Sequence, residues 1–165
     1  MGKVLNLKEL SAIRNICRKN NERVVFTNGV FDIIHRGHIE YLAKAKAQGD
    51  ILIVGINSDN SVRRIKGEER PVVPEEDRAF IVANLLPVDY VCLFDEDTPL
   101  RLISDLLPDV LVKGADWKTE KIVGKDVVEK AGGVVRNIAL TPGRSTTSII
   151  DKILNRFPNV GKTKK

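Results

Sequence analysis

Short apolar segments alternate with amphipathic ones along most of this 165-residue chain. Five segments are continuous rather than alternating and rich in Val and Ile, as strands buried on both faces of a sheet are: residues 23–27, 51–56, 90–94, 110–113 and 134–138. Seven segments between or beside them have apolar residues at helical spacing: 7–20, 38–48, 59–65, 75–86, 99–107, 122–130 and 145–156. This order predicts an α/β fold, a Rossmann-like, doubly wound, five-stranded parallel sheet with an extra N-terminal helix.

The residues at helix ends support these boundaries. We expect Thr98 to cap the helix at 99–107, with Pro99 in its first turn, and Ser145 to cap the last helix. The length fits a single domain, residues 1–157, in which residues 1–22 are a helical extension. Residues 158–165 form a basic tail that we expect to be disordered.

Both histidines of the chain fall within four residues, His35-Arg36-Gly37-His38, at the start of a predicted helix. Gly37 allows close approach of a phosphate, and a helix N-terminus favours an anion. Imidazoles three positions apart share one face, so both can donate to phosphate oxygens. Two alternative interpretations are that the histidines are a pair of surface residues, or that they are half of the ligands of a metal site. A zinc site is disfavoured because there is no third histidine and the cysteines are distant, so we predict no protein metal ligands.

Polar clusters follow four of the predicted strands. They lie at residues 27–32, 57–59, 113–117 and 141–147. In an open parallel sheet, ligands bind beyond the carboxyl ends of the strands, near the point where the strand order reverses. The four clusters therefore predict one ligand site on one rim of the sheet.

Composition excludes several classes of protein. No apolar run approaches the roughly 20 residues of a membrane span, and the N-terminus has no apolar leader, so we expect a soluble cytoplasmic protein. Cys17 and Cys92 are single and distant, which indicates buried thiols. The net charge of +5 and the Arg63-Arg64 pair fit a polyphosphate substrate, and they also fit a nucleic-acid-binding module. The charge is scattered and no aromatic platform accompanies it, so we expect no nucleic-acid or membrane partner.

Several stretches together resemble the heptose 1-phosphate adenylyltransferase family, the nucleotidyltransferase domain of ADP-heptose synthase. They are FTNGVFDIIHRGHIEYLAKAKAQGD, INSDNSVRRIKG, RPVVPEEDRA, VDYVCLFDEDTP, PDVLVKGADW and GRSTTSII, within residues 23–152. The His-x-Gly-His core belongs to a wider superfamily that includes cytidylyltransferases, whereas DEDTP, VLVKGADW and STTSII point to the heptose branch. Two positions depart from the family: Val30 stands where Cys is frequent, and Ala115 where a second Gly is common.

The resemblance implies that ATP and D-glycero-D-manno-heptose 1-phosphate, as the β anomer, give ADP-heptose and pyrophosphate for lipopolysaccharide core or a related surface glycan. The sugar phosphate would attack the α-phosphorus in line, with Mg²⁺ held mainly by the ATP phosphates. A homodimer is common among such enzymes, and a heptose kinase, separate or fused, would belong to the same pathway. The nearest alternative is a cytidylyltransferase acting on glycerol 3-phosphate or a similar phosphorylated alcohol.

The resemblance also implies roles for individual residues. The catalytic residues would be His35, His38 and Lys66. The nucleotide would contact Asn28, Gly29, Val30, Phe31, His35, Gly37, His38, Lys113, Gly114, Asp116, Arg144, Ser145, Thr146 and Thr147. The acceptor would contact Asp32, Asp59, Lys66, Arg78 and Trp117.

For some of these residues a structural role stays open beside the functional one. Asp32 is expected to brace its loop rather than act as a base, and Arg78 either reaches the phosphates or ties a helix to a loop. Ser145 can cap a helix while binding an anion, and Trp117 packs in the core or contacts ligand. The loop at residues 66–74, with two prolines and four charges, is either solvated or a lid over the triphosphate.

Overall fold

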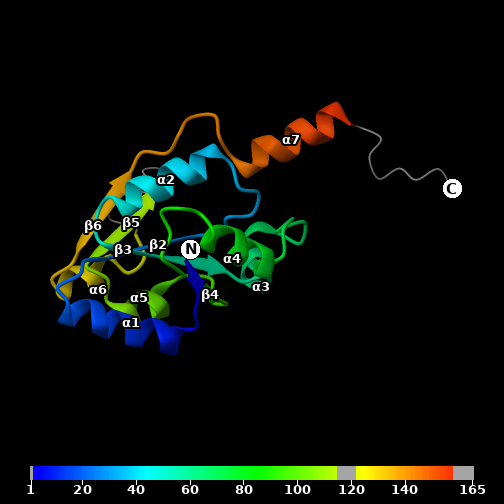
Figure 1. The fold of residues 1–165 in the computed structure, drawn as a ribbon. Coiled ribbons are helices and arrows are strands. Elements are labelled where there is room, and N and C mark those ends of the chain that lie inside the picture. The colour runs from blue at the N-terminus through cyan, green and yellow to red at the C-terminus, as the bar shows by residue number, and fades with distance from the viewer. Residues whose placement is uncertain (1, 115–121, 158–165) are drawn as a thin grey trace.

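A computed structural model describes residues 2–114 and 122–157, and a single parallel sheet runs through its centre (Figure 1). Its strands are β1 (Lys3–Val4), β2 (Val24–Gly29), β3 (Ile51–Asn57), β4 (Tyr90–Phe94), β5 (Val110–Gly114) and β6 (Val134–Ile138). The spatial order is β1-β4-β3-β2-β5-β6, with every neighbouring pair parallel. The predicted doubly wound sheet is confirmed. β1 adds a sixth strand, because two residues at an edge are too few to produce a periodic signal.

The strand order reverses beside β2. The chain runs from β2 to β3 and β4 on one side, and then returns to lay β5 and β6 on the other. The switch point therefore lies between β2 and its two neighbours, at the carboxyl end of β2.

Seven helices are described. They are α1 (Leu7–Lys19), α2 (Arg36–Lys46), α3 (Asp59–Lys66), α4 (Glu75–Ala83), α5 (Leu100–Leu106), α6 (Lys125–Lys130) and α7 (Thr146–Arg156). α1 begins with a capping box between Asn6 and Glu9, and ends with basic residues in its last turn, so both termini are satisfied.

The helices form a layer on each face of the sheet. One core packs α2 and α4 against side chains such as Val25, Val54 and Val91. The other packs α1, α5 and α6 against the alternate side chains, such as Phe26 and Ile53. Burial on both faces explains why the strands have continuous apolar sequences.

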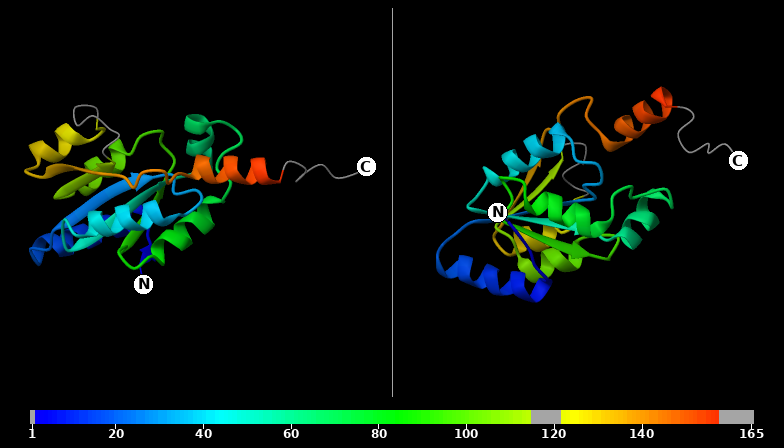
Figure 2. Two further views of the ribbon diagram at one scale, coloured as in Figure 1. Left: turned by 90° about the horizontal axis from the view of Figure 1, so that it is seen from above. Right: turned by 45° about the vertical axis from the view of Figure 1, so that its right-hand side comes forward.

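α7 is the exception to this packing. It extends away from the sheet, and none of its residues is buried (Figure 2). Only its N-terminal end, which follows β6 through a long loop, lies beside α2.

The prediction that Thr98 caps α5 is wrong by one residue. The carbonyl of Pro99 accepts the first helical hydrogen bond, from the Ile103 amide at 2.9 Å, so Pro99 is the cap. Thr98 is left free of the helix.

Two other helices are shorter than predicted. α6 begins after Gly124, whose backbone is left-handed at φ 87°, and a Cβ there would lie 2.7 Å from Ile103 Cδ1. α4 stops before Asn84, whose backbone and side-chain amides both donate to the Phe80 carbonyl.

Cys17 and Cys92 are both free and buried, as the sequence indicates, and burial raises the pKa of the Cys92 thiol to about 11. No helix in the described ranges is long and apolar enough to cross a bilayer. Asp116 and Trp117, and the expected tail at 158–165, lie outside the described residues.

Candidate active site

A cavity of about 420 Å³ opens at the carboxyl end of β2, where the strand order reverses. It is called the first cavity below. Its lining comes from the ends of β2 and β5, the start of α2, the end of α3 and the start of α7: Asn28, Gly29, Val30, Phe31, His35, Gly37, His38, Tyr41, Lys66, Lys113, Gly114, Leu140, Thr141, Arg144, Ser145 and Thr146. The structure thus brings most of the sequence-predicted nucleotide-binding residues into one place. Thr147 lies in the first turn of α7 but does not line this cavity.

The two histidines form a stacked pair in this cavity. Their ring centroids lie 3.8 Å apart, with an angle of 15° between the rings. His35 is the N-cap of α2 and His38 lies in its first turn, which brings the side chains together one above the other. Phe31 packs against His38, with ring centroids 5.2 Å apart, and so supports the pair.

Burial lowers the pKa of both imidazoles. Burial and, to a smaller extent, the neighbouring His35 together lower the pKa of His38 to about 4. Burial also lowers the pKa of His35, as does the nearby Arg144 charge. The Nδ1 atoms of both rings are buried and have no hydrogen-bond partner among the described residues. An unpaired buried donor costs more than an unpaired acceptor, so the geometry favours a proton on Nε2, the nitrogen that a ligand can reach.

Gly37 makes the close packing of this corner feasible. A Cβ at this position would lie 3.1 Å from His35 Cε1 and Nδ1, and 3.1 Å from Arg144 Cβ. The glycine therefore allows the His35 ring and the loop that carries Arg144 to meet over the start of α2.

The backbone after β2 presents free amides to the cavity. Phe31 has a left-handed backbone, at φ 49°, which is unusual for a bulky residue and typical of strained functional loops. In the described part of the chain, nothing accepts a hydrogen bond from the amides of Val30 or Phe31. Both residues line the cavity, so these N–H groups are available to an anion.

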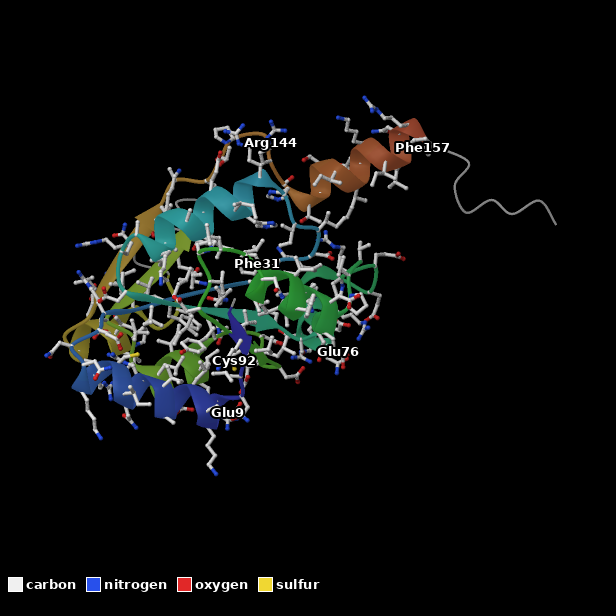
Figure 3. All side chains as sticks on the ribbon, in the orientation of Figure 1. Glu9, Phe31, Glu76, Cys92, Arg144 and Phe157 are labelled. Carbon is white, nitrogen blue, oxygen red and sulfur yellow. The ribbon has the colours of Figure 1, made fainter. Side chains whose placement is uncertain are left out.

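The start of α7 supplies a second set of donors. Ser145 caps the helix by accepting from the Ser148 amide at 3.1 Å, which confirms the predicted cap. Thr146 is tied to the β2–α2 loop through the Ile33 carbonyl at 3.4 Å, so the two helix N-termini lie side by side. Arg144 stands on the loop between them (Figure 3). Two helix N-termini that face one cavity both favour an anion.

Three residues expected at the acceptor, Asp32, Asp59 and Arg78, do not line the first cavity. Asp32 is 2% exposed, and its carboxylate accepts from the amides of Val72 and Val73 and from Arg70 Nε at 2.7 Å. It therefore braces the loop, as the sequence favours, and pins the second half of the 66–74 segment. Of the residues in that segment, only Lys66 lines the first cavity or the second cavity that adjoins it.

Arg78 and Asp59 form a second brace. Arg78 is fully buried and donates to the carbonyls of Val73, Val30 and Asn57, and to Asp59 at 2.7 Å. Arg78 thus ties α4 to the ends of β2 and β3, which is the structural alternative that its sequence context left open. Neither residue lines the two cavities described here.

A second cavity, of about 400 Å³, adjoins the first. It is lined by Asn28, Gly29, Val30, Asn57, Ile65, Lys66, Asp97, Thr98, Pro99, Lys113, Ile122 and Val123. Five residues belong to both linings: Asn28, Gly29, Val30, Lys66 and Lys113. Lys113 donates to Asn28 Oδ1, which fixes this shared wall.

Sequence reasoning missed the part of the second cavity that comes from residues 97–99. The DEDTP segment follows β4 and so satisfies the same carboxyl-end rule as the four polar clusters. That rule was the signal that could have found it.

The described lining of the first cavity is cationic. It contains Lys66, Lys113, Arg144 and two histidines, and among the described residues it has no acidic side chain. In the described ranges, no group of three or more His, Cys, Asp or Glu side chains could hold a metal ion. The donors present suit phosphate oxygens rather than a cation.

Comparisons with known proteins agree with this geometry. A family model described as cytidylyltransferase-like matches residues 26–152. Bifunctional protein HldE of Geobacter metallireducens is 55% identical over 156 residues, which are 94% of this chain and 32% of that protein. Bifunctional protein HldE of Helicobacter pylori is 50% identical over 151 residues, 92% of this chain and 31% of that protein. The chain therefore spans about a third of the length of the curated relatives it matches.

Two solved structures are similar in fold. The lipopolysaccharide core biosynthesis protein from Thermoplasma volcanium has a TM-score of 0.60 and 31% identity, with 73% of this chain and 97% of that chain covered. Pantoate-beta-alanine ligase from Francisella tularensis has a TM-score of 0.62 at 16% identity, with 99% and 80% covered, and supports the fold alone.

Proposed function

The chain belongs to the cytidylyltransferase-like family, and on that premise we propose that it is an adenylyltransferase that converts ATP and D-glycero-D-manno-heptose 1-phosphate to ADP-heptose and pyrophosphate. The observation that carries the proposal is the stacked pair of His35 and His38 beside two free backbone amides, in a cavity whose described lining has no acidic side chain. Such a site holds a chain of phosphates rather than a metal, a nucleic-acid base or a peptide.

The reaction needs no base from the protein. An oxygen of the sugar phosphate is already anionic at neutral pH and attacks the α-phosphorus, while the bond to the bridging oxygen breaks and pyrophosphate leaves. Catalysis then rests on alignment and on stabilising the charge that develops around the α-phosphorus. Mg²⁺ would enter with ATP as part of the substrate, held mainly by its phosphates.

The residues of the first cavity divide this task. His35 and His38, neutral in the free protein, donate from Nε2 to phosphate oxygens, with the Val30 and Phe31 amides below them. Arg144 and the N-terminus of α7, at Ser145 and Thr146, neutralise the departing pyrophosphate. Lys66 lies on the shared wall and bridges the two substrates.

The heptose acceptor rests on the sequence. The DEDTP, VLVKGADW and STTSII segments resemble the heptose branch, and the relatives at 50–55% identity are named Bifunctional protein HldE. Those relatives are about three times longer, so we also propose that a heptose kinase acts with this domain, fused or separate. The remaining proposals are one catalytic domain over residues 1–157, a homodimer, and a location in the cytoplasm, where ATP is supplied.

Pyrophosphate release separates this function from its nearest alternative. The chain is assayed with ATP or CTP, each paired with α- or β-heptose 1-phosphate or with glycerol 3-phosphate. We expect turnover with ATP and the β anomer. Turnover only with CTP and glycerol 3-phosphate would make the chain a cytidylyltransferase for a small phosphorylated alcohol.

A further inference from the structure

The DEDTP segment has no role in the mechanism above, yet part of it lines the second cavity. Asp97, Thr98 and Pro99 belong to this lining and not to the shared wall. The two substrates must meet at the α-phosphorus, and the wall shared by both cavities is the place where a ligand in one can reach a ligand in the other. In-line attack requires the acceptor to enter from the side opposite the leaving pyrophosphate, so the two cavities suit the two substrates.

Charge decides which cavity takes which substrate. Among the described residues, the lining of the first cavity has only cationic and neutral side chains, whereas that of the second contains one carboxylate, Asp97. A carboxylate repels a triphosphate, so the triphosphate belongs in the first cavity. The second cavity suits a molecule that is uncharged at the Asp97 end and anionic at the end near Lys66.

Asp97 is held in place with one oxygen free. Arg64 Nε lies 2.6 Å from Asp97 Oδ1, and the same guanidinium donates to the Asp95 carbonyl. Asp97 Oδ2 has no partner among the described residues. A carboxylate oxygen fixed in this way accepts hydrogen bonds from hydroxyl groups at little further entropic cost.

Apart from Asp97 and the shared wall, the described lining of the second cavity is mainly apolar. It consists of Ile65, Pro99, Ile122 and Val123, together with Asn57 and Thr98. A mainly apolar wall with a few placed polar groups is typical of small-molecule sites, and the C–H face of a sugar ring packs well on such a wall.

We propose that the second cavity binds the sugar ring of the acceptor, and that Asp97 is a specificity-determining residue that accepts hydrogen bonds from sugar hydroxyls. The 1-phosphate then lies at Lys66, on the shared wall. Asp97 selects a polyhydroxylated sugar phosphate over glycerol phosphate, which has fewer hydroxyl groups and no ring to pack in this cavity. This inference rests on the proposed function.

The test compares Asp97→Ala and Asp97→Asn with Glu96→Gln in the complete chain. Glu96 is the matched control, because it is an adjacent carboxylate that pairs with Arg101 at 3.3 Å and lines neither cavity. The Asp97 side chain is 57% exposed, so its variants keep the fold, which thermal unfolding checks.

We expect Asp97→Ala to raise the KM for heptose 1-phosphate by about tenfold or more, as loss of a charged hydrogen bond does. The KM for ATP and the kcat stay within about threefold of the wild type, and Glu96→Gln changes neither KM. Deoxy analogues of heptose 1-phosphate identify the hydroxyl that Asp97 binds. The wild type binds the analogue without that hydroxyl more weakly than the parent sugar phosphate, whereas Asp97→Ala binds the two equally.

Unchanged KM values for heptose 1-phosphate in both Asp97 variants, with an active wild type, would overturn the inference and leave the proposed function standing. The inference would also be overturned if every deoxy analogue lost the same affinity in the wild type as in Asp97→Ala. A wild-type enzyme that turns over no heptose 1-phosphate would refute the proposed function, and this inference with it.

Discussion

Asp32→Asn tests whether the wall of the site depends on one buried carboxylate. The Asp32 side chain is 1% exposed and accepts three hydrogen bonds, from the Val72 amide at 2.9 Å, the Val73 amide at 2.8 Å and Arg70 Nε at 2.7 Å. Asparagine has the same shape but can accept on one oxygen only, and its NH₂ group would face a donor. The substitution therefore leaves at least one donor unpaired and Arg70 without its counter-charge.

The magnitude follows from these contacts. Breaking a buried ion pair by removing one partner costs about 3–5 kcal/mol, and the partial exposure of Arg70, at 20%, favours the lower end. We expect Asp32→Asn to lower the free energy of unfolding by about 3 kcal/mol, which is roughly 6–12 °C in Tm for a chain of this length.

The dependence on pH has a definite sign. Burial alone would raise the pKa of Asp32, but the hydrogen bonds from Val73, Val72 and Arg70 outweigh it, so the net pKa is lowered. The contribution of Asp32 to stability is therefore present above the unfolded-state pKa, and is lost as the pH falls through the lower folded-state pKa. The destabilisation by Asp32→Asn is expected to be full at pH 7 and to shrink in strong acid.

Urea denaturation at pH 7, repeated in acid, measures both effects. Asp105→Asn is the matched control, because Asp105 is exposed near the end of α5, and we expect a change within about 0.5 kcal/mol there. A loss below about 1 kcal/mol for Asp32→Asn would refute the reasoning, since the three bonds would then contribute little.

Three further predictions concern the histidine corner. His38→Ala lowers kcat by about 10²–10³, as loss of a preorganised donor does, with binding of ATP measured in parallel; a loss of tenfold or less would remove His38 from catalysis. Burial lowers the pKa of His38 to about 4, so we expect the pH profile of kcat/KM for ATP to have no inflection near pH 6.5 that comes from His38. An inflection there that disappears in His38→Ala would mean that this imidazole is charged in the free enzyme. Gly37→Ala presses a Cβ against the His35 ring and Arg144 at 3.1 Å. We expect kcat to fall about tenfold or more, while the free energy of unfolding changes by less than about 1 kcal/mol because alanine favours the helix. Unfolding curves and kcat measured on the same variant separate the two effects, and an unchanged kcat would contradict the prediction.

The sequence predicts the strands and the rim of the site because the relevant signals are local. Continuous Val and Ile runs mark strands covered on both faces, and polar residues after each run mark the carboxyl ends. β1 escapes this reasoning because Lys3 and Val4 pair with β4 at an edge, and a two-residue strand has no period to detect.

The rest of the site depends on contacts between distant segments. Asp32 and Arg78 stand in motifs that suggest ligand contact, yet their partners are side chains 19 or more residues away or backbone groups. Only the folded chain shows that the Val72 and Val73 amides pair with Asp32, and that the Val30 carbonyl pairs with Arg78. In the same way, only the folded chain shows that Asp97, which lines the second cavity, pairs with Arg64 of α3.

The central claim is that the first cavity presents the α-phosphorus of ATP to a sugar phosphate. The most direct measurement follows ATP and β-heptose 1-phosphate by ³¹P NMR, with wild type and His38→Ala side by side. The account predicts that pyrophosphate and ADP-heptose form in equal amounts with the wild type and far more slowly with the variant. Release of ADP and inorganic phosphate, or equal rates in both proteins, would contradict it.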